Sequence, residues 1–291
     1  MDAMIQEFSL ALEAEGKRAK TIKIYADAAA WLQRAQGLTD WSEVKRSHVR
    51  AHLAHILEGH SDSYANQQYR SLRRFFAFLE EEEGIANPTA NVKPPRITEK
   101  LVPLVSDAEW SALTRTCSGK TFLDIRDKAV FEMFRATGAR LAEVTSLKIT
   151  DVDIDLLSAI VTGKNGKMRI VRFDAACALA LVRYLRVRKN HKHASSPMLW
   201  VGVDGPLHGN AVYLMFRSRG EKAGVKIHPH QFRHTLARKW LANDGQEGDL
   251  MQQTGWSSRE MLRRYGASAA AERARAHYDA VMSKKPKKRE K

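Results

Sequence analysis

Two short segments of the sequence place basic side chains where they could bind a phosphate group. Arg140 follows the glycine turn of ATGARLAEV, and Glu143 lies one helical turn further on, where its carboxylate can hold the guanidinium in one orientation. The segment TGKNGK, residues 162–167, places Lys164 and Lys167 at the tip of a predicted hairpin. Either lysine can reach a phosphate or protonate a leaving oxygen. Exposed pairs and turn lysines are common on protein surfaces, so neither segment alone indicates a site.

A third segment, HPHQFRHT, combines histidine and arginine at the predicted start of a helix. Pro229 suits the first helical turn, and His230 and Arg233, three residues apart, then project from one face. The amino terminus of a helix attracts anions through its free N–H groups and its dipole. His230 and Arg233 therefore lie where an anion would bind, whereas the pattern assigns no role to His228 and His234.

A fourth segment, TGWSSREMLRRYG, carries a tyrosine nine residues after a tryptophan. Gly255 is predicted to end one helix, and Ser257 with Glu260 forms a capping box that begins the next. Trp256 then lies in a turn, where its indole N–H can donate outward. Tyr265 is either a half-buried packing residue or a nucleophile, and an isolated tyrosine is usually the former.

Several helices must position these segments. Residues 1–85 repeat apolar positions at helical spacing, for example at Val49, Leu53, Ile56 and Leu57. Each repeat predicts a helix with one buried face.

Further local signals set the ends of helices in the second half of the chain. Ser106 and Glu109 form a capping box, Gly138 is placed to end a helix, and a short helix is predicted over residues 140–148.

One stretch of the second half has the pattern of a sheet. SAIVTGKNGKMRIVRF contains two β-branched runs around residues 163–166, which predict a hairpin with an Asn-Gly turn. Helical periodicity then continues to about residue 280. The fold class is therefore mainly α with a small β-sheet (α+β).

The charge of the chain indicates a polyanionic partner. The 291 residues include 48 Lys and Arg against 33 Asp and Glu, a net charge of +15. Residues 1–97 contain 13 basic and 13 acidic residues, so the whole excess lies in residues 98–291. Basic side chains at phosphates release counterions and give affinity for nucleic acid that is independent of sequence. We therefore expect the second part of the chain to hold most of the anion.

Other features of composition exclude several classes of protein. No apolar run is long enough to span a bilayer, and the amino terminus is not signal-like, so no membrane association is expected. Cys117 and Cys177 are the only cysteines, which predicts structural thiols in a reducing compartment. No GxxxxGK[ST] loop or metal-ligand cluster is present, so we expect no cofactor and no metal.

Taken together and in this order, the four segments resemble the tyrosine recombinase (phage integrase) family. The matching residues are Thr137-Gly138-Ala139-Arg140-Leu141-Ala142-Glu143, Gly163-Lys164, His230-Gln231-Phe232-Arg233, and Gly255-Trp256-Ser257-Ser258 leading to Tyr265. The resemblance covers residues 100–280. It departs from the usual pattern at Trp256, where most of the family has histidine and Cre-like recombinases have tryptophan. That departure puts proton transfer at this position in doubt and leaves hydrogen bonding intact.

The resemblance implies an enzyme that cuts and rejoins DNA through a 3′-phosphotyrosyl intermediate. The implied catalytic residues are Arg140, Lys164, His230, Arg233, Trp256 and Tyr265. Tyr265 would attack a phosphodiester and release a 5′-hydroxyl. Arg140 and Arg233 would clamp the nonbridging oxygens, and two permanently charged guanidiniums can replace a metal ion there.

The remaining roles follow from the chemistry of each side chain. His230 is the best candidate base or hydrogen-bond donor, and Trp256 is a neutral donor to the phosphate. Lys164 is the general acid for the 5′-oxygen, with Lys167 as a possible substitute. Glu143 orients Arg140 or a neighbouring residue.

The resemblance also implies two domains and self-association on DNA. The predicted bounds are 1–90 for an N-terminal helical core DNA-binding domain, 91–103 for a linker, 104–282 for the tyrosine recombinase catalytic domain and 283–291 for a basic disordered tail. The linker falls in a proline-rich stretch without periodicity. The partners would be double-stranded DNA with a specific core site and further copies of the chain, as a tetramer on two DNA sites.

Two other functions remain open at this stage. A non-catalytic DNA-binding regulator would need no tyrosine at this spacing, and a type IB topoisomerase would relax DNA without pairing two sites. The chain is too short for an additional arm-binding domain, so we expect a compact recombinase that recognises simple core sites. We expect it in the cytoplasm, bacterial or phage-encoded and associated with the nucleoid. The sequence identifies neither the DNA site nor any accessory protein. It is compatible both with DNA integration and with the resolution of chromosome dimers.

Overall fold

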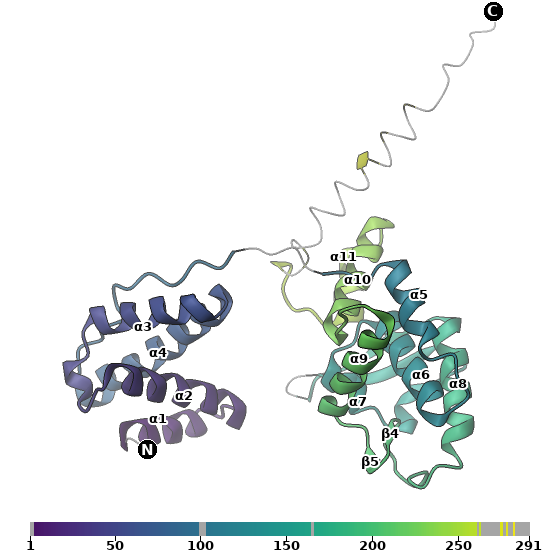
Figure 1. Cartoon of the computed structure of the whole chain (residues 1–291), viewed down its shortest axis with the longest axis horizontal. Coiled ribbons are helices and arrows are strands. Elements are labelled where there is room, and N and C mark those ends of the chain that lie inside the picture. The colour runs from purple at the N-terminus through teal and green to yellow at the C-terminus, as the bar shows by residue number, and fades with distance from the viewer. Residues whose placement is uncertain are drawn as a thin grey trace, which may run out of the picture. The chain divides into compact units, whose positions relative to one another are not determined.

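The computed structural model describes residues 3–98, 103–163, 166–260 and the single residues 262, 274, 275, 278 and 282. The chain divides into two compact units, Met1–Leu101 and Val102–Lys291 (Figure 1). No helix in these described ranges is both long and apolar enough to cross a bilayer.

The N-terminal unit is helical. Its elements are α1 (Ala3–Ala14), α2 (Ala19–Gln36), the 3-10 turn η1 (Trp41–Glu43), α3 (Arg46–Gly59) and α4 (Asp62–Glu83). The predicted apolar face of α3 is buried at Val49, Leu53 and Ile56, whereas Leu57 is 46% exposed. The prediction for Leu57 was wrong, because the helix turns this position away from α2 and α4, against which α3 packs.

The segment after α4 stays attached to the N-terminal unit. Val92 is buried and its carbonyl accepts a hydrogen bond from the Tyr69 hydroxyl at 2.8 Å. Further along, Asn66 donates to the carbonyl of Pro95 at 2.8 Å. Residues 92–98 therefore run along α4 before the division between the two units.

The C-terminal unit packs helices around a small sheet. Its elements are α5 (Asp107–Arg115), α6 (Phe122–Thr137), α7 (Leu141–Thr145), η2 (Ile149–Asp151), β1 (Val152–Asp153), β2 (Ser158–Thr162), β3 (Met168–Arg172), α8 (Ala175–Arg188), β4 (Val201–Gly202), β5 (Gly205–Pro206), α9 (Gly209–Ala223), α10 (Pro229–Ala242) and α11 (Glu247–Thr254). Helix α6 lies against both α8 and α10 and forms the centre of the apolar core. The mainly α fold with a small sheet is confirmed.

The expected helix ends are present. Ser106 and Glu109 form the predicted capping box, with the Ser106 N–H donating to the Glu109 carboxylate at 2.8 Å. Gly138 and Gly255 end α6 and α11 in the left-handed conformation, at φ values of 59° and 67°. The short helix after Gly138 is narrower than predicted and covers Leu141–Thr145.

The predicted hairpin is also present, with a longer connection. Strands β2 and β3 pair antiparallel up to Thr162 and Met168, and the Gly163 N–H donates to the Lys167 carbonyl at 2.7 Å. The strands are thus joined through residues 163–167, which is longer than a two-residue turn, and Asn165 of the predicted Asn-Gly turn lies outside the described residues. The β4–β5 ribbon was missed, because two-residue strands carry no readable periodicity.

Candidate active site

The start of α7 presents an arginine held by a carboxylate. Arg140 is the N-cap of this helix in an extended conformation, and its backbone N–H donates to Glu143 Oε2 at 2.7 Å. Its guanidinium donates from Nη1 to Glu143 Oε1 at 2.7 Å and from Nη2 to the Gly255 carbonyl at 3.1 Å. These side-chain bonds use two of its five N–H donors, and 41% of the side chain is exposed. The guanidinium is thus fixed in orientation while still open to a ligand.

A second arginine, Arg169 on β3, shares the same carboxylate and was missed in the sequence. Its Nη1 donates to Glu143 Oε1 at 2.8 Å and its Nη2 to Oε2 at 2.9 Å. Its Nε donates to the Gln253 carbonyl at 3.2 Å. The strand pattern contained a signal, because Arg169 lies two residues before Val171, which is fully buried, and therefore on the same face. An arginine on a buried face requires a carboxylate partner.

Glu143 is a buried carboxylate that stays ionised. Burial raises the pKa of Glu143, but the hydrogen bonds from Arg169 and Arg140 outweigh it and lower the pKa to about 2. Each oxygen accepts two of the four bonds described above, so the carboxylate is fully satisfied. Because two guanidiniums share one carboxylate, the cluster of Arg140, Glu143 and Arg169 carries a net charge of +1.

Arg233 is the second predicted guanidinium and lies almost fully inside the protein. It is 1% exposed, and its Nη1 donates to the Gly138 carbonyl at 3.0 Å. Its guanidinium carbon lies 5.0 Å from the centroid of the Trp256 ring, within the range of a cation–π contact. A Cβ at position 138 would approach Leu236 Cδ2 to 2.7 Å, so glycine permits both the left-handed turn and the close packing of α6 on α10.

His230 lies near both guanidiniums at the start of α10. Partial desolvation lowers its pKa below the usual 6.5, and the positive charges of Arg233, His228 and Arg140 lower it further. The ring remains accessible to solvent. Its centroid is 4.6 Å from that of His234 at an interplanar angle of 80°, so His234, which received no role in the sequence, is an immediate neighbour. The imidazole is thus kept neutral at pH 7 and is available as a base.

Trp256 is more deeply buried than its predicted place in a turn implied. It is 8% exposed and belongs to a small apolar cluster with Leu241 and Leu250. The cap that follows also differs, since Ser258 accepts the hydrogen bond from the Glu260 N–H at 3.1 Å in place of Ser257. The indole therefore packs against the Arg233 guanidinium inside the protein, and a small part of it also borders the surface.

An open groove of about 670 Å³ connects several of these elements. Arg140, Lys167 and Trp256 line it, together with Arg169 and Gly255. Its basic lining suits an anionic ligand. The predicted Lys164 and Tyr265 lie outside the described residues, as does the predicted tail 283–291.

A comparison with known protein families decides what kind of protein carries this groove. Residues 105–272 match the phage integrase family. The chain belongs to this family.

Relatives of this integrase-family chain include bacterial tyrosine recombinases. Tyrosine recombinase XerC of Chromobacterium violaceum is 30% identical over 251 residues, which are 84% of this chain and 83% of the relative. Tyrosine recombinase XerC of Actinobacillus pleuropneumoniae serotype 7 is 29% identical over 226 residues, 76% of this chain and 74% of the relative.

Solved structures show the same fold over nearly the whole integrase-family chain. The Tn1549 transposon integrase in complex with transposon right end DNA has a TM-score of 0.76 at 20% identity and covers 96% of this chain and 99% of its own. A lambda integrase dimer bound to a COC′ core site has a TM-score of 0.72 at 18% identity and covers 91% of this chain and 76% of its own.

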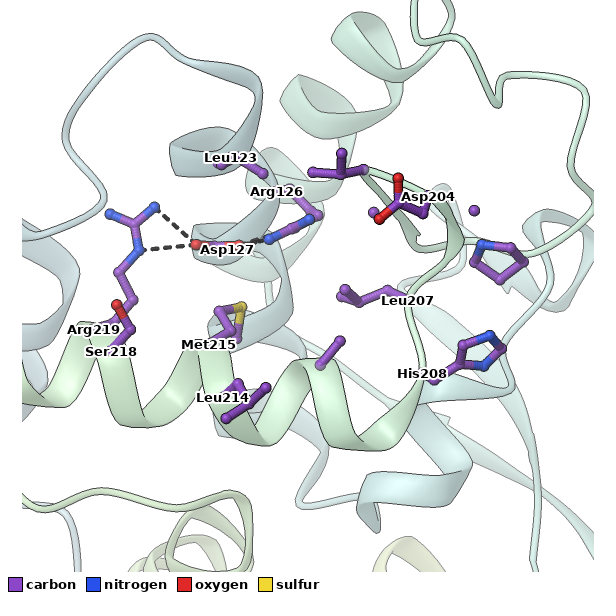
Figure 2. A pocket seen from close by; sticks show the side chains of 15 residues that line it. Leu123, Arg126, Asp127, Asp204, Leu207, His208, Leu214, Met215, Ser218 and Arg219 are labelled. Atoms are coloured by element: carbon purple, nitrogen blue, oxygen red, sulfur yellow. Dashed lines mark hydrogen bonds and ion pairs between the residues drawn. The ribbon is translucent and has the colours of Figure 1, made fainter.

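The integrase-family chain has a second hollow, of about 510 Å³, away from the predicted residues (Figure 2). Asp127 lies beside it and accepts from Arg126 Nη2 at 2.6 Å and from Arg219 Nε at 2.8 Å. Figure 2 shows both guanidiniums turned toward this carboxylate. Arg219 also pairs with Asp124 at 2.9 Å, so two carboxylates balance the two guanidiniums and the hollow offers less to an anion than the groove with Arg140.

Within the part of the chain that the structure describes, no three His, Cys, Asp or Glu side chains lie close enough to hold a metal ion. Cys117 and Cys177 are both buried and neither is in a disulfide, and burial raises the pKa of each thiol. This agrees with the prediction of structural thiols.

Proposed function

We propose that this chain is a site-specific DNA recombinase, an integrase, that uses Tyr265 as its nucleophile. As a tyrosine recombinase of the phage integrase family, it is an enzyme that cleaves and rejoins DNA. The observation that carries the proposed mechanism is that two guanidiniums lie at the same turn, because Arg233 bonds the carbonyl of Gly138 and Arg140 follows that glycine by two residues. Arg140 is anchored on Glu143, and Arg233 is anchored on the Gly138 carbonyl and the Trp256 ring.

In the proposed reaction, one phosphorus–oxygen bond replaces another. The Tyr265 oxygen bonds to the scissile phosphorus, the bond from phosphorus to the 5′-oxygen breaks, and the 3′-phosphotyrosyl intermediate keeps the bond energy for rejoining. The phenol gives its proton to neutral His230, because a tyrosine has a reference pKa of about 10 and needs a base at neutral pH. The 5′-oxygen takes a proton from Lys164, or from Lys167 in its place.

The arginines supply the electrostatic part of this mechanism. Negative charge gathers on the nonbridging oxygens in the transition state, and guanidiniums can hold them with paired hydrogen bonds. Arg140 has donors left for this purpose. Trp256 completes the site as a neutral donor, and Glu143 positions Arg140. No step in this scheme requires a metal ion or another cofactor.

A covalent adduct tests the nucleophile directly. The DNA site is first identified by sequencing the DNA that flanks the gene, and a nicked suicide duplex carrying that site is incubated with the protein. We expect a protein–DNA band under denaturing conditions. Tyr265→Phe should lose the band and keep DNA binding, while Tyr213→Phe, an exposed tyrosine on α9, should keep both. An adduct formed by Tyr265→Phe would refute the assignment.

The same assay separates the other two functions. A non-catalytic regulator would bind the duplex and give no adduct. A type IB topoisomerase would give an adduct and relax supercoiled DNA, but would not join two sites in one complex. We propose a recombinase because the full set of predicted residues accompanies the family match. Its place of action would be the nucleoid in the cytoplasm.

We also propose that the N-terminal unit is a core DNA-binding domain that clamps the duplex with the catalytic domain. A cluster of exposed basic residues, including Lys17 and Lys20, supports this although the net charge of the segment is zero. Lys17→Ala/Lys20→Ala should weaken DNA binding and flatten its salt dependence, because two phosphate contacts are lost. Lys45→Ala, an exposed lysine on another helix end, is the control. Equal salt slopes for the two variants would count against the clamp.

Finally, we propose that the chain acts as a tetramer on two DNA sites. A lambda integrase tetramer bound to a Holliday junction has the same fold, with a TM-score of 0.71 at 16% identity. Tyr278 and Met282, four residues apart, are 63% and 66% exposed, as expected of side chains that a neighbouring subunit covers. Tyr278→Ser/Met282→Ser should prevent pairing of two sites while single-site binding persists. Leu156→Ser, also at 63% exposure, serves as the control and should pair sites normally.

A further inference from the structure

We infer that Arg169 is a positioning residue for the phosphate-binding arginine: it offsets the charge of Glu143 and fixes the two groups on which Arg140 rests. This inference rests on the proposed function, in which Arg140 binds the scissile phosphate. Arg169 borders the groove, but only 10% of its side chain is exposed and its Nε, Nη1 and Nη2 already donate to the Gln253 carbonyl and to Glu143, so its effect on DNA is transmitted through Arg140.

Arg169 adds a positive charge beside the Arg140–Glu143 pair. Arg140 and Glu143 alone would form a neutral pair, whose attraction for a phosphate is weak. With Arg169 on the other side of the carboxylate, the cluster carries a net charge of +1. Charges in a partly buried cluster act on a nearby anion more strongly than they would in water. Glu143 can therefore hold Arg140 in place without cancelling its charge.

Arg169 also fixes the position of Arg140. Arg140 has two side-chain anchors, Glu143 Oε1 and the Gly255 carbonyl. Arg169 holds Glu143 through both carboxylate oxygens. It also bonds the Gln253 carbonyl at the end of α11 and packs directly under Gly255, where a Cβ would lie 2.7 Å from its Nη1. Both anchors of Arg140 thus depend on one buried guanidinium.

Loss of Arg169 would change the protonation state of Glu143 as well as the position of its carboxylate. Burial of Glu143 favours its neutral form, and the bonds from Arg169 are the largest contribution against that effect. A lysine at position 169 would restore a positive charge but not the paired bonds to both oxygens. The two features can therefore be separated by substitution.

The test compares cleavage of three suicide duplexes by wild type, Arg169→Met and Arg169→Lys. One duplex has an ordinary scissile phosphodiester. The second has a methylphosphonate there, which removes one negative oxygen and reduces the need for guanidinium charge. The third has sulfur in place of the bridging 5′-oxygen, which leaves without a general acid. Arg172→Met and Arg172→Lys, at an exposed arginine of the same strand, are matched controls.

On the ordinary duplex we expect Arg169→Met to cleave about 10- to 100-fold more slowly than wild type, a typical loss for a residue that positions another. On the methylphosphonate the difference should shrink to about threefold or less, because less charge needs stabilisation. On the sulfur duplex the difference should persist. Arg169→Lys should show a smaller loss of cleavage rate with the same pattern across the three duplexes. If Arg169→Met shows no cooperative thermal unfolding and is therefore not folded, Arg169→Lys takes its place in the comparison.

Several outcomes would overturn the inference alone. One is an undiminished rate of Arg169→Met on the ordinary duplex, and another is an equal loss of rate on all three duplexes. A third is recovery of the rate on the sulfur duplex only, which would mean that Arg169 supports the proton donor on the hairpin and not Arg140. If wild type forms no adduct with any duplex, the proposed function fails and the inference fails with it.

Discussion

The guanidinium of Arg169 occupies the space beside Gly255 that a side chain would need. A Cβ at position 255 would lie 2.7 Å from Nη1 and 2.8 Å from Cζ of Arg169. Gly255 also has a φ of 67°, in the left-handed region that favours glycine. The turn before Trp256 is therefore closed by a residue of the β2–β3 hairpin, which joins the two segments at the groove.

Gly255→Ala should lower both stability and cleavage. Gly224→Ala is a matched control, since Gly224 also ends a helix at positive φ but has no atom within 4 Å of the place that a methyl group would take. We expect about 1 kcal/mol of destabilisation for the control from backbone strain, and about 1–3 kcal/mol more at position 255 because Arg169 must move. Denaturant unfolding measures both. If both variants lose the same free energy of unfolding, Arg169 moves away from the new methyl group without destabilising the protein.

The pH dependence of cleavage should report His230. Its lowered pKa keeps the imidazole neutral at pH 7, so the single-turnover rate should hold as pH falls to about 6.5 and decline only below that value. His230→Gln should lose this acidic limb and about 100-fold in rate. His208→Gln, an exposed histidine elsewhere, should match wild type. A wild-type rate that already falls between about pH 8 and pH 7 would contradict a neutral His230.

Substitution of Trp256 should separate packing from hydrogen bonding. Trp256→Phe keeps an aromatic face beside Arg233 and removes the indole N–H, so we expect near-normal melting and about tenfold slower cleavage. Trp256→Ala also empties the apolar cluster and should lose about 3–5 kcal/mol of stability. If Trp256→Phe cleaves as fast as wild type, the tryptophan acts through packing alone.

Cleavage should proceed in the presence of a chelator. Because guanidiniums take the electrostatic role in the proposed mechanism, EDTA should leave the rate of adduct formation unchanged, and added Mg²⁺ should not raise it beyond an ionic-strength control. A rate that collapses in EDTA and returns with a divalent ion would show that a metal takes part.

The N-terminal unit contains a buried histidine that should make stability depend on pH. His52 is 0% exposed, packs edge-on against Trp31 with ring centroids 5.0 Å apart, and has no hydrogen-bond partner among the described residues. Desolvation, followed by the nearby His55, lowers its pKa from 6.5 to about 4. Between pH 6.5 and about pH 4, His52 is therefore protonated in the unfolded chain and neutral in the folded chain. Stability should be highest above pH 6.5 and fall as pH decreases toward 4, by on the order of 3 kcal/mol.

His52→Phe isolates this effect in the full chain. The substitution keeps a ring against Trp31 and removes the titrating group. The stability of the variant relative to wild type should increase steadily as the pH is lowered, as measured by urea unfolding. A constant difference across the pH range would contradict the assignment.

The sequence by itself determined the features that depend on neighbours along the chain. The bond from Arg140 to Glu143 spans three residues, and the capping box at Ser106 spans three as well. Gly138 and Gly255 end helices because glycine alone adopts the left-handed conformation without strain. The order of four motifs was sufficient to predict the family, since each motif is a local pattern.

Only the tertiary structure decided which distant groups meet. Arg169 and Glu143 are 26 residues apart and Arg233 and Gly138 are 95 apart, so neither bond follows from helical or strand periodicity. The burial of Trp256 depends on how α10 packs against α11. Such contacts are set by the packing of whole elements, in which many weak interactions add up across the chain, and no single segment contains that information.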